Sequence, residues 1–100
     1  MVEYQVTCIN KPNPQSQHQE ITHIGNLADQ WRLSLDGVIY QLEKKVSSFY
    51  VFDPASRQRC YLEVVRELGK RPYVKAHVNG KWTDHLLALE ECDDNCRIVS

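Results

Sequence analysis

Two of the four cysteines and two of the four histidines are candidate ligands of a metal ion. They are Cys8, His18, His23 and Cys92. Thiolate sulfur and imidazole nitrogen are common ligands of structural zinc sites, and four such ligands can close a tetrahedral shell. A zinc site of this composition requires the first predicted strand, the loop after it and the C-terminal segment to converge.

Each of these residues also has a simpler interpretation. Cys8 falls on the apolar face of its predicted strand, where a buried free thiol packs as a small hydrophobe. His18 and His23 are five residues apart, so on an extended segment their side chains point to opposite faces. A histidine hydrogen-bonded to a backbone carbonyl is therefore favoured for His23. The sequence favours no cofactor, with zinc as the alternative.

Four cysteines are present, at positions 8, 60, 92 and 96. The first residues lack the basic segment and long apolar stretch of a secretory signal, so a cytoplasmic location is expected. In that compartment thiols stay reduced unless they bind a metal or act in catalysis. Cys92 and Cys96 are separated by three residues, which matches neither the usual zinc knuckle nor the thioredoxin motif.

A second set of residues combines aromatic and basic side chains on one predicted hairpin. Residues 57–75 contain six basic and two acidic residues. A sheet face with this composition predicts a binding surface, for which a protein partner is favoured over single-stranded nucleic acid. The alternative is an ordinary solvated face. The candidate binding residues are Arg59, Tyr61, Tyr73, Lys75, His77 and Trp82.

Acidic side chains gather near the C-terminus, where residues 84–94 carry five of them. They lack the loop pattern of a calcium site and are expected to be solvated. The four glycines form neither a phosphate-binding loop nor a nucleophile elbow. No serine is placed for activation by a histidine and an acid. The sequence therefore predicts a protein that is not an enzyme.

Composition limits the remaining classes. The chain has 100 residues, of which 42% are apolar and 25% charged, with a net charge of −1. These values are typical of one soluble globular domain. No apolar run reaches the roughly 18 residues of a membrane span, and the net charge gives no general attraction to nucleic acid or anionic membranes. The sequence is compatible with a monomer or with a homodimer formed through a sheet edge or the hairpin.

Hydrophobic spacing identifies the elements that carry these residues. Apolar residues alternate from Val2 to Cys8, which predicts one strand. A loop over residues 10–19 and a short strand over residues 20–25 follow. Residues 35–45 have apolar side chains at helical spacing, and Ser34 is placed to cap that helix.

The next strands form hairpins. Residues 49–52 are apolar on both faces and predict a central strand. Keeping one apolar face requires Glu63 opposite Lys75 and Tyr61 opposite His77, with a three-residue loop and a left-handed Gly69. Asn79-Gly80 predicts a tight turn, and residues 85–89 predict a short helical turn capped by Asp84.

Together these elements predict an α+β fold with an antiparallel sheet of four to five strands and one main helix. Residues 1–92 are expected to form the single domain. Residues 93–100 are expected to form an acidic C-terminal tail.

Several of these segments resemble a small bacterial family known only as a domain of unknown function. The resemblance extends from Tyr4 to Cys92. It rests on Lys11-Pro12-Asn13, on Ile21-Thr22-His23-Ile24-Gly25, on Trp31, on Phe49-Tyr50-Val51 and on residues 84–92. It differs at Ala76, His85, Glu90 and the last eight residues. The resemblance implies a small bacterial protein and a helix packed on a sheet, and it implies no activity.

Overall fold

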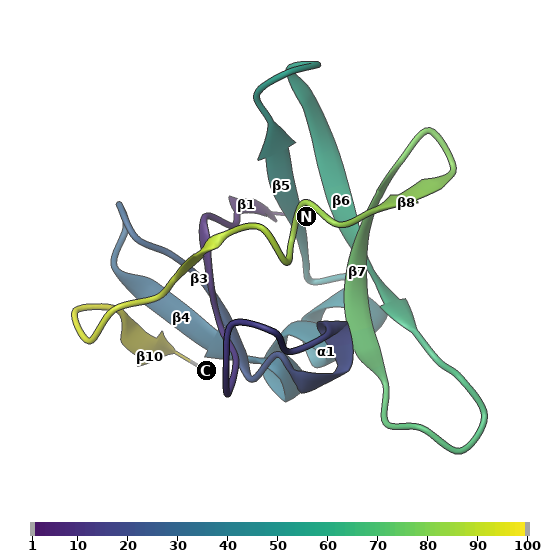
Figure 1. The fold of residues 1–100 in the computed structure, drawn as a ribbon, viewed down its shortest axis with the longest axis horizontal. Helices are drawn as coiled ribbons and strands as arrows, with labels where there is room; N and C mark the ends of the chain where they lie inside the picture. The colour runs from purple at the N-terminus through teal and green to yellow at the C-terminus, as the bar shows by residue number, and fades with distance from the viewer. Residues whose placement is uncertain (1, 100) are drawn as a thin grey trace.

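Two five-stranded sheets and one α-helix make up the structure, a computed structural model that describes residues 2–99 (Figure 1). Sheet A has the order β1 (Val2–Gln5), β5 (Ser47–Asp53), β6 (Gln58–Val65), β7 (Tyr73–Val78) and β8 (Lys81–Thr83). Sheet B has the order β10 (Arg97–Val99), β4 (Trp31–Ser34), β3 (His23–Asn26), β2 (Cys8–Asn10) and β9 (Glu90–Glu91). The helix α1 is Leu35–Glu43, and the 3-10 turn η1 is His18–Glu20.

The α+β class is confirmed, whereas the single antiparallel sheet is wrong. Both sheets are mixed, because β1 pairs parallel to β5, β10 pairs parallel to β4 and β2 pairs parallel to β9. These parallel pairs join segments that are distant in the sequence. Alternation of apolar residues identifies a strand but does not specify its partner, so the sequence pattern alone could not predict them.

The predicted first strand is divided between the two sheets. The amide of Val6 donates to the carbonyl of Tyr50 in sheet A (2.8 Å), and the next amide, of Thr7, donates to Gly25 in sheet B (2.9 Å). The chain therefore changes sheets between β1 and β2. The apolar alternation continues through this crossing because Val6 and Cys8 are both buried.

Helix α1 confirms the predicted stripe and cap. The backbone amide of Gly37 donates to the Ser34 hydroxyl at 3.2 Å, which satisfies one of the free donors of the first turn. Val38 and Ile39 are buried, and Leu35 and Leu42 pack against the core. The helix contacts strands of both sheets, and in Figure 1 it lies beneath them between β4 and β7.

The hairpin register of sheet A is confirmed. Glu63 pairs with Lys75 and Tyr61 with His77. Gly69 has a φ of 76° as predicted, but the loop spans residues 66–72 because the ladder ends at the pair Val65–Tyr73. The predicted Asn79-Gly80 turn connects β7 directly to β8, and both turn residues have positive φ values.

Part of the segment expected to be an acidic tail, Arg97–Val99, belongs to sheet B. Residues Arg97–Val99 form β10, which pairs with β4. Residues 84–89 form consecutive turns, with backbone bonds from Leu87 to Asp84 and from Leu89 to Leu86, rather than a helix. The C-terminal residues therefore close one edge of the fold.

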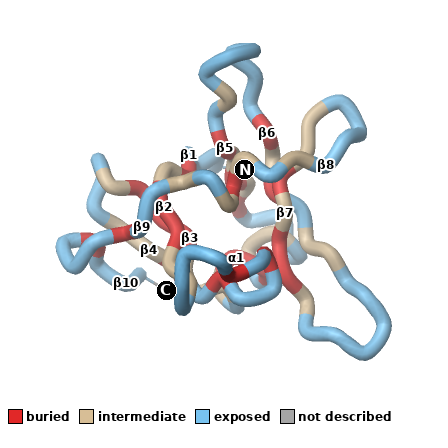
Figure 2. The backbone as a smooth tube through the Cα atoms, in the orientation of Figure 1, coloured by how far each residue is buried: buried red, intermediate tan, exposed pale blue. Residues whose placement is uncertain are grey.

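One main hydrophobic cluster unites the two sheets and the helix. It includes Ile9 and Ile24 of sheet B, Phe49 and Val74 of sheet A, and Val38 of α1. Figure 2 shows buried residues where these elements meet and exposed residues in the hairpin loops. Among the described residues, no helix is both long and apolar enough to span a membrane.

Candidate functional site

The outer face of sheet A carries a continuous row of aromatic side chains across neighbouring strands. Tyr50 lies opposite Tyr61, Tyr61 opposite His77, and His77 opposite Trp82. Side chains at paired positions lie on the same face of a sheet and contact one another. We call this surface the aromatic face and define it as Glu3, Tyr50, Phe52, Arg59, Tyr61, Glu63, Lys75, His77 and Trp82.

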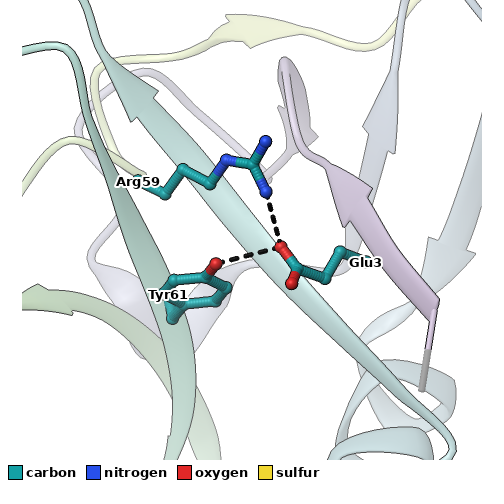
Figure 3. Close-up of polar contacts among 3 residues, drawn as sticks. All are labelled: Glu3, Arg59 and Tyr61. Atoms are coloured by element: carbon teal, nitrogen blue, oxygen red, sulfur yellow. Dashed lines mark hydrogen bonds and ion pairs between the residues drawn. The ribbon is translucent and has the colours of Figure 1, made fainter.

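Polar contacts organise one half of the aromatic face. One carboxylate oxygen of Glu3 accepts hydrogen bonds from Arg59 at 2.8 Å and from the Tyr61 hydroxyl at 2.9 Å (Figure 3). The Arg59 guanidinium lies 4.6 Å from the centre of the Tyr50 ring. The pKa of Arg59 is raised above its usual range, first by a side-chain hydrogen bond with Tyr61. The charge interaction with Tyr50 and the hydrogen bond with Glu3 act in the same direction. Arg59 is therefore a fixed positive charge with a defined orientation.

His77 organises the other half of the face. Its Nε2 lies 2.9 Å from a carboxylate oxygen of Glu63, and its ring makes an edge contact with Trp82 at a centroid distance of 5.5 Å. Glu63 thus contacts His77 diagonally across the strand pair, although Lys75 lies directly opposite it. Trp82 is 51% exposed and Phe52 is 42% exposed, so both rings are accessible to a partner.

Tyr73 does not belong to the aromatic face, although the sequence predicted it there. It is only 7% exposed, and its hydroxyl donates to the Glu67 carboxylate in the long hairpin loop. This bond raises the pKa of Tyr73 and lowers that of Glu67. The alternation placed Tyr73 on the correct side of its strand. The side chain is buried because the hairpin loop that carries Glu67 lies against it, and the alternation does not predict the path of that loop.

The four predicted zinc ligands do not converge. Cys8 and Cys92 are joined by a disulfide, which leaves neither sulfur as a free thiolate. Within residues 2–99, one group of at least three histidine, cysteine or acidic side chains is close enough to hold a metal ion. That group contains Cys8, Cys92 and Cys96. Neither His18 nor His23 is part of it.

The two histidines lie in separate environments. His18 is buried in η1, where burial followed by the charge of Lys75 lowers its pKa. His23 begins β3 and its Nδ1 lies 3.0 Å from the Thr22 hydroxyl. Burial of the ring, followed by the positive charge of Arg32, lowers the pKa of His23. Neither imidazole approaches the sulfur cluster closely enough to share a metal ion with it.

Several members of the aromatic face are absent from the residues that the sequence predicted for it. Tyr50 and Phe52 lie in the strand predicted to be central and apolar on both faces, but their face is open, with Phe52 exposed and Tyr50 half-buried. Glu3 lies 56 residues before Arg59, and their contact depends on the parallel pairing of β1 with β5. The alternation of β5 could have indicated Tyr50 and Phe52, but no local pattern indicates Glu3.

A second surface, also not foreseen, is an apolar groove between α1 and β10. Its inner part has a volume of about 200 Å³ and lies among Tyr4, Trp31 and Phe49, with Leu33, Gln41 and Val99 completing the wall. The groove continues over an outer part that shares Leu33, Gln41 and Val99 and adds Ser34, Gly37, Tyr40, Val46 and Ile98. The apolar side chains among these additions, Tyr40, Val46 and Ile98, are exposed. We call this surface the apolar groove.

Comparison with known proteins identifies a family. Residues 5–90 match the family described as "Protein of unknown function (DUF3892)". No curated protein and no solved structure matches the chain. The match extends from the last residue of β1 to the first residue of β9, so it includes every residue of the aromatic face except Glu3. The chain therefore belongs to the DUF3892 family of proteins of unknown function.

Proposed function

We propose that this protein is a binding module that recognises a different protein chain through the aromatic face. The observation that supports this proposal is the row formed by Tyr50, Tyr61, His77 and Trp82 across four adjacent strands. Tyrosine, tryptophan and arginine are the residue types most enriched among the energetic centres of protein interfaces. A sheet also presents them rigidly, which reduces the entropy lost on binding.

The charge of the aromatic face favours a protein over nucleic acid. Glu3 and Glu63 carry two negative charges, and Arg59 and Lys75 carry two positive charges, so the face has no net charge when His77 is neutral. Binding of nucleic acid depends on several basic contacts to phosphate. A neutral aromatic surface instead suits a partner surface of low net charge.

The internal contacts of the face reduce the cost of covering it. Arg59 and Tyr61 are already hydrogen-bonded to Glu3, and His77 already contacts Glu63. A polar group that keeps its hydrogen bond in the complex avoids much of the desolvation penalty that an unpaired group incurs. The face can therefore lose water without leaving these groups unsatisfied.

The apolar groove is a second candidate binding surface within the same function. Tyr40, Val46 and Ile98 are 61%, 54% and 63% exposed and surround one depression. Contiguous exposed apolar groups commonly mark interaction sites. The groove lies at the α1–β10 side of the molecule, so contacts made by the two surfaces can be tested separately.

Photocrosslinking in living cells tests this proposal. A benzophenone amino acid replaces Trp82 on the aromatic face, Tyr40 at the groove, or Leu68 in the β6–β7 loop, where the side chain is fully exposed. We expect a discrete adduct with a different protein at position 82 and no such adduct at position 68. With that protein purified, Trp82→Ala should weaken binding at least about tenfold, whereas Leu68→Ala should leave it unchanged.

Other results contradict the proposal in identifiable ways. An adduct at position 40 alone assigns binding to the apolar groove, and an adduct between two copies of this chain assigns it to self-association. Fluorescence anisotropy with a 20-nucleotide oligo-dT at two salt concentrations tests the nucleic-acid alternative. Tight binding that weakens steeply with salt and is lost in Trp82→Ala would mean that the aromatic face binds single-stranded nucleic acid instead of a protein.

A further inference from the structure

Three sulfur atoms form a buried cluster at one end of sheet B. Cys8 and Cys92 form a disulfide, and the free thiol of Cys96 completes the cluster, with all three sulfurs within 4.8 Å of one another. Their exposed fractions are 0%, 5% and 2%. Leu27 packs against them, while Cys60 lies in the main hydrophobic core. The disulfide therefore has a free thiol, that of Cys96, as its immediate neighbour.

Backbone contacts hold Cys92 against β2. Its amide donates to the Ile9 carbonyl at 3.1 Å, and its carbonyl accepts from the Asn10 side chain at 3.0 Å. Cys8 is fixed more firmly, because β2 pairs with β3 on one side and with β9 on the other. Of the two bonded residues, Cys92 lies on the shorter and less extensively paired segment.

A short turn brings Cys96 back to the same place. The amide of Cys96 donates to the Asp93 carbonyl at 3.1 Å, and the Asp93 side chain accepts from the amide of Asn95 at 3.0 Å. The Cys96 thiol faces the carbonyl of Asn26, 3.9 Å away. Cys92 and Cys96 therefore belong to one compact turn whose two sulfurs converge on Cys8.

We propose that these cysteines form a disulfide-exchange site, in which Cys96 displaces Cys8 from Cys92. The Cys96 thiolate attacks the Cys92 sulfur, so a Cys92–Cys96 bond forms as the Cys8–Cys92 bond breaks. The electron pair of the broken bond goes to the Cys8 sulfur, which takes up the proton that Cys96 has lost. One thiol and one disulfide are present before and after the step, so it needs neither an oxidant nor a reductant.

The geometry favours exchange within the cluster over attack from outside. The sulfurs are nearly inaccessible to solvent, so a small thiol must wait for a local opening of the structure. Cys96 is already beside the disulfide, and a reacting group held in place has an effective concentration far above that of a free reagent.

Exchange changes how the C-terminal segment is attached. The present bond joins residues 84 positions apart and ties the turn after β9 to β2. The alternative bond joins residues only four apart, within one turn. In that form β9 and β10 depend on non-covalent contacts alone, and Cys8 becomes a free thiol. The two pairings thus define a closed and a released state of the sheet B edge.

Disulfide mapping of the wild-type protein tests the exchange. The protein is held in a glutathione redox buffer, quenched with acid and alkylated, and then cut before Asp93 and Asp94, which separates Cys92 from Cys96. We expect two pools, one containing Cys8–Cys92 and one containing Cys92–Cys96 with alkylated Cys8. The second pool should form faster at pH 8 than at pH 6.5, because the thiolate is the attacking species. Only Cys8–Cys92 under every condition would overturn the proposal.

Three variants identify the roles of the individual sulfur atoms, so the test does not depend on the correct folding of any single variant. Cys8→Ser should form Cys92–Cys96 when glutathione disulfide is added, with release of two molecules of glutathione. Cys96→Ala should eliminate the second pool, and Cys60→Ala, a matched change of a buried thiol, should retain both pools. A Cys8–Cys96 bond in the wild type would overturn the assignment of Cys92 as the shared sulfur.

Discussion

His18 is a titratable group placed where its charged form is disfavoured. The side chain is 6% exposed, and its Nε2 is buried without a hydrogen-bond partner among the described residues. Burial is the main cause that lowers its pKa; Lys75 and Lys11 act in the same direction, and Asp84 opposes them. Burial of the imidazole therefore disfavours its protonated form in the folded protein.

The pKa of His18 determines the direction of its effect on stability. Because the pKa lies below 6.5 in the folded state, the unfolded chain binds more protons as the pH falls below about 6.5. We expect the melting temperature to fall between pH 7.5 and pH 5.5, and to fall less in His18→Gln. Differential scanning calorimetry at both pH values measures this, and equal decreases in the two proteins would exclude His18 as a contributor.

Gly25 shows a different constraint at the scale of one residue. A side chain added there would place its Cβ 2.3 Å from the carbonyl oxygen of Trp31 on the neighbouring strand. The sequence pattern predicts that a strand ends at Gly25. In the structure it lies inside β3, and glycine is required by the close approach of β4 rather than by a turn.

At the scale of the element, the start of helix α1 depends on a single capping side chain. The Ser34 hydroxyl accepts from the amide of Gly37, and Asp36 adds a negative charge in the first turn. Both features stabilise the positive end of the helix. The same turn also borders the apolar groove, because Ser34 and Gly37 line its outer part.

Replacing the capping residue measures this contribution. We expect Ser34→Ala to lower the free energy of unfolding by about 1 kcal/mol, because an amide of the first turn loses its acceptor. Ser34→Asp keeps an acceptor oxygen at the cap and should stay close to the wild type. Urea denaturation followed by circular dichroism provides both values. Equal losses in the two variants would mean that the hydroxyl acts through another contact.

At the scale of the whole molecule, the disulfide joins the two ends of the chain. Cys8 precedes most of the fold and Cys92 follows most of it, with a separation of 84 residues. The sequence predicts free thiols at both positions. The structure pairs these residues because β2 and β9 lie side by side, a proximity that the spacing of cysteines along the sequence does not reveal.

Reduction should therefore destabilise the protein as a whole. We expect dithiothreitol to lower the free energy of unfolding by about 2–4 kcal/mol, because the unfolded chain loses a long covalent loop. Urea midpoints with and without reductant measure the change. The double variant Cys8→Ala, Cys92→Ala should be insensitive to reductant, and Cys60→Ala should keep the full sensitivity. A wild-type midpoint unaffected by complete reduction would contradict this role.

Local sequence patterns predict the features that depend on residues close together in the chain or in one hairpin. These are the helix with its Ser34 cap, the Asn79-Gly80 turn and the pairing of Tyr61 with His77. Each follows from side-chain periodicity, capping or turn chemistry over a few residues. The same periodicity predicted most of the aromatic face, because strand alternation assigns side chains to one surface.

Contacts between distant segments, in contrast, arise only when the complete chain folds. The parallel pairing of β1 with β5 brings Glu3 to Arg59, and the approach of β9 to β2 brings Cys92 to Cys8. The division of the first strand between two sheets and the burial of Tyr73 also depend on the path of the whole chain. Alternation specifies which side of a strand is apolar, but strand partners are selected by packing of the complete core.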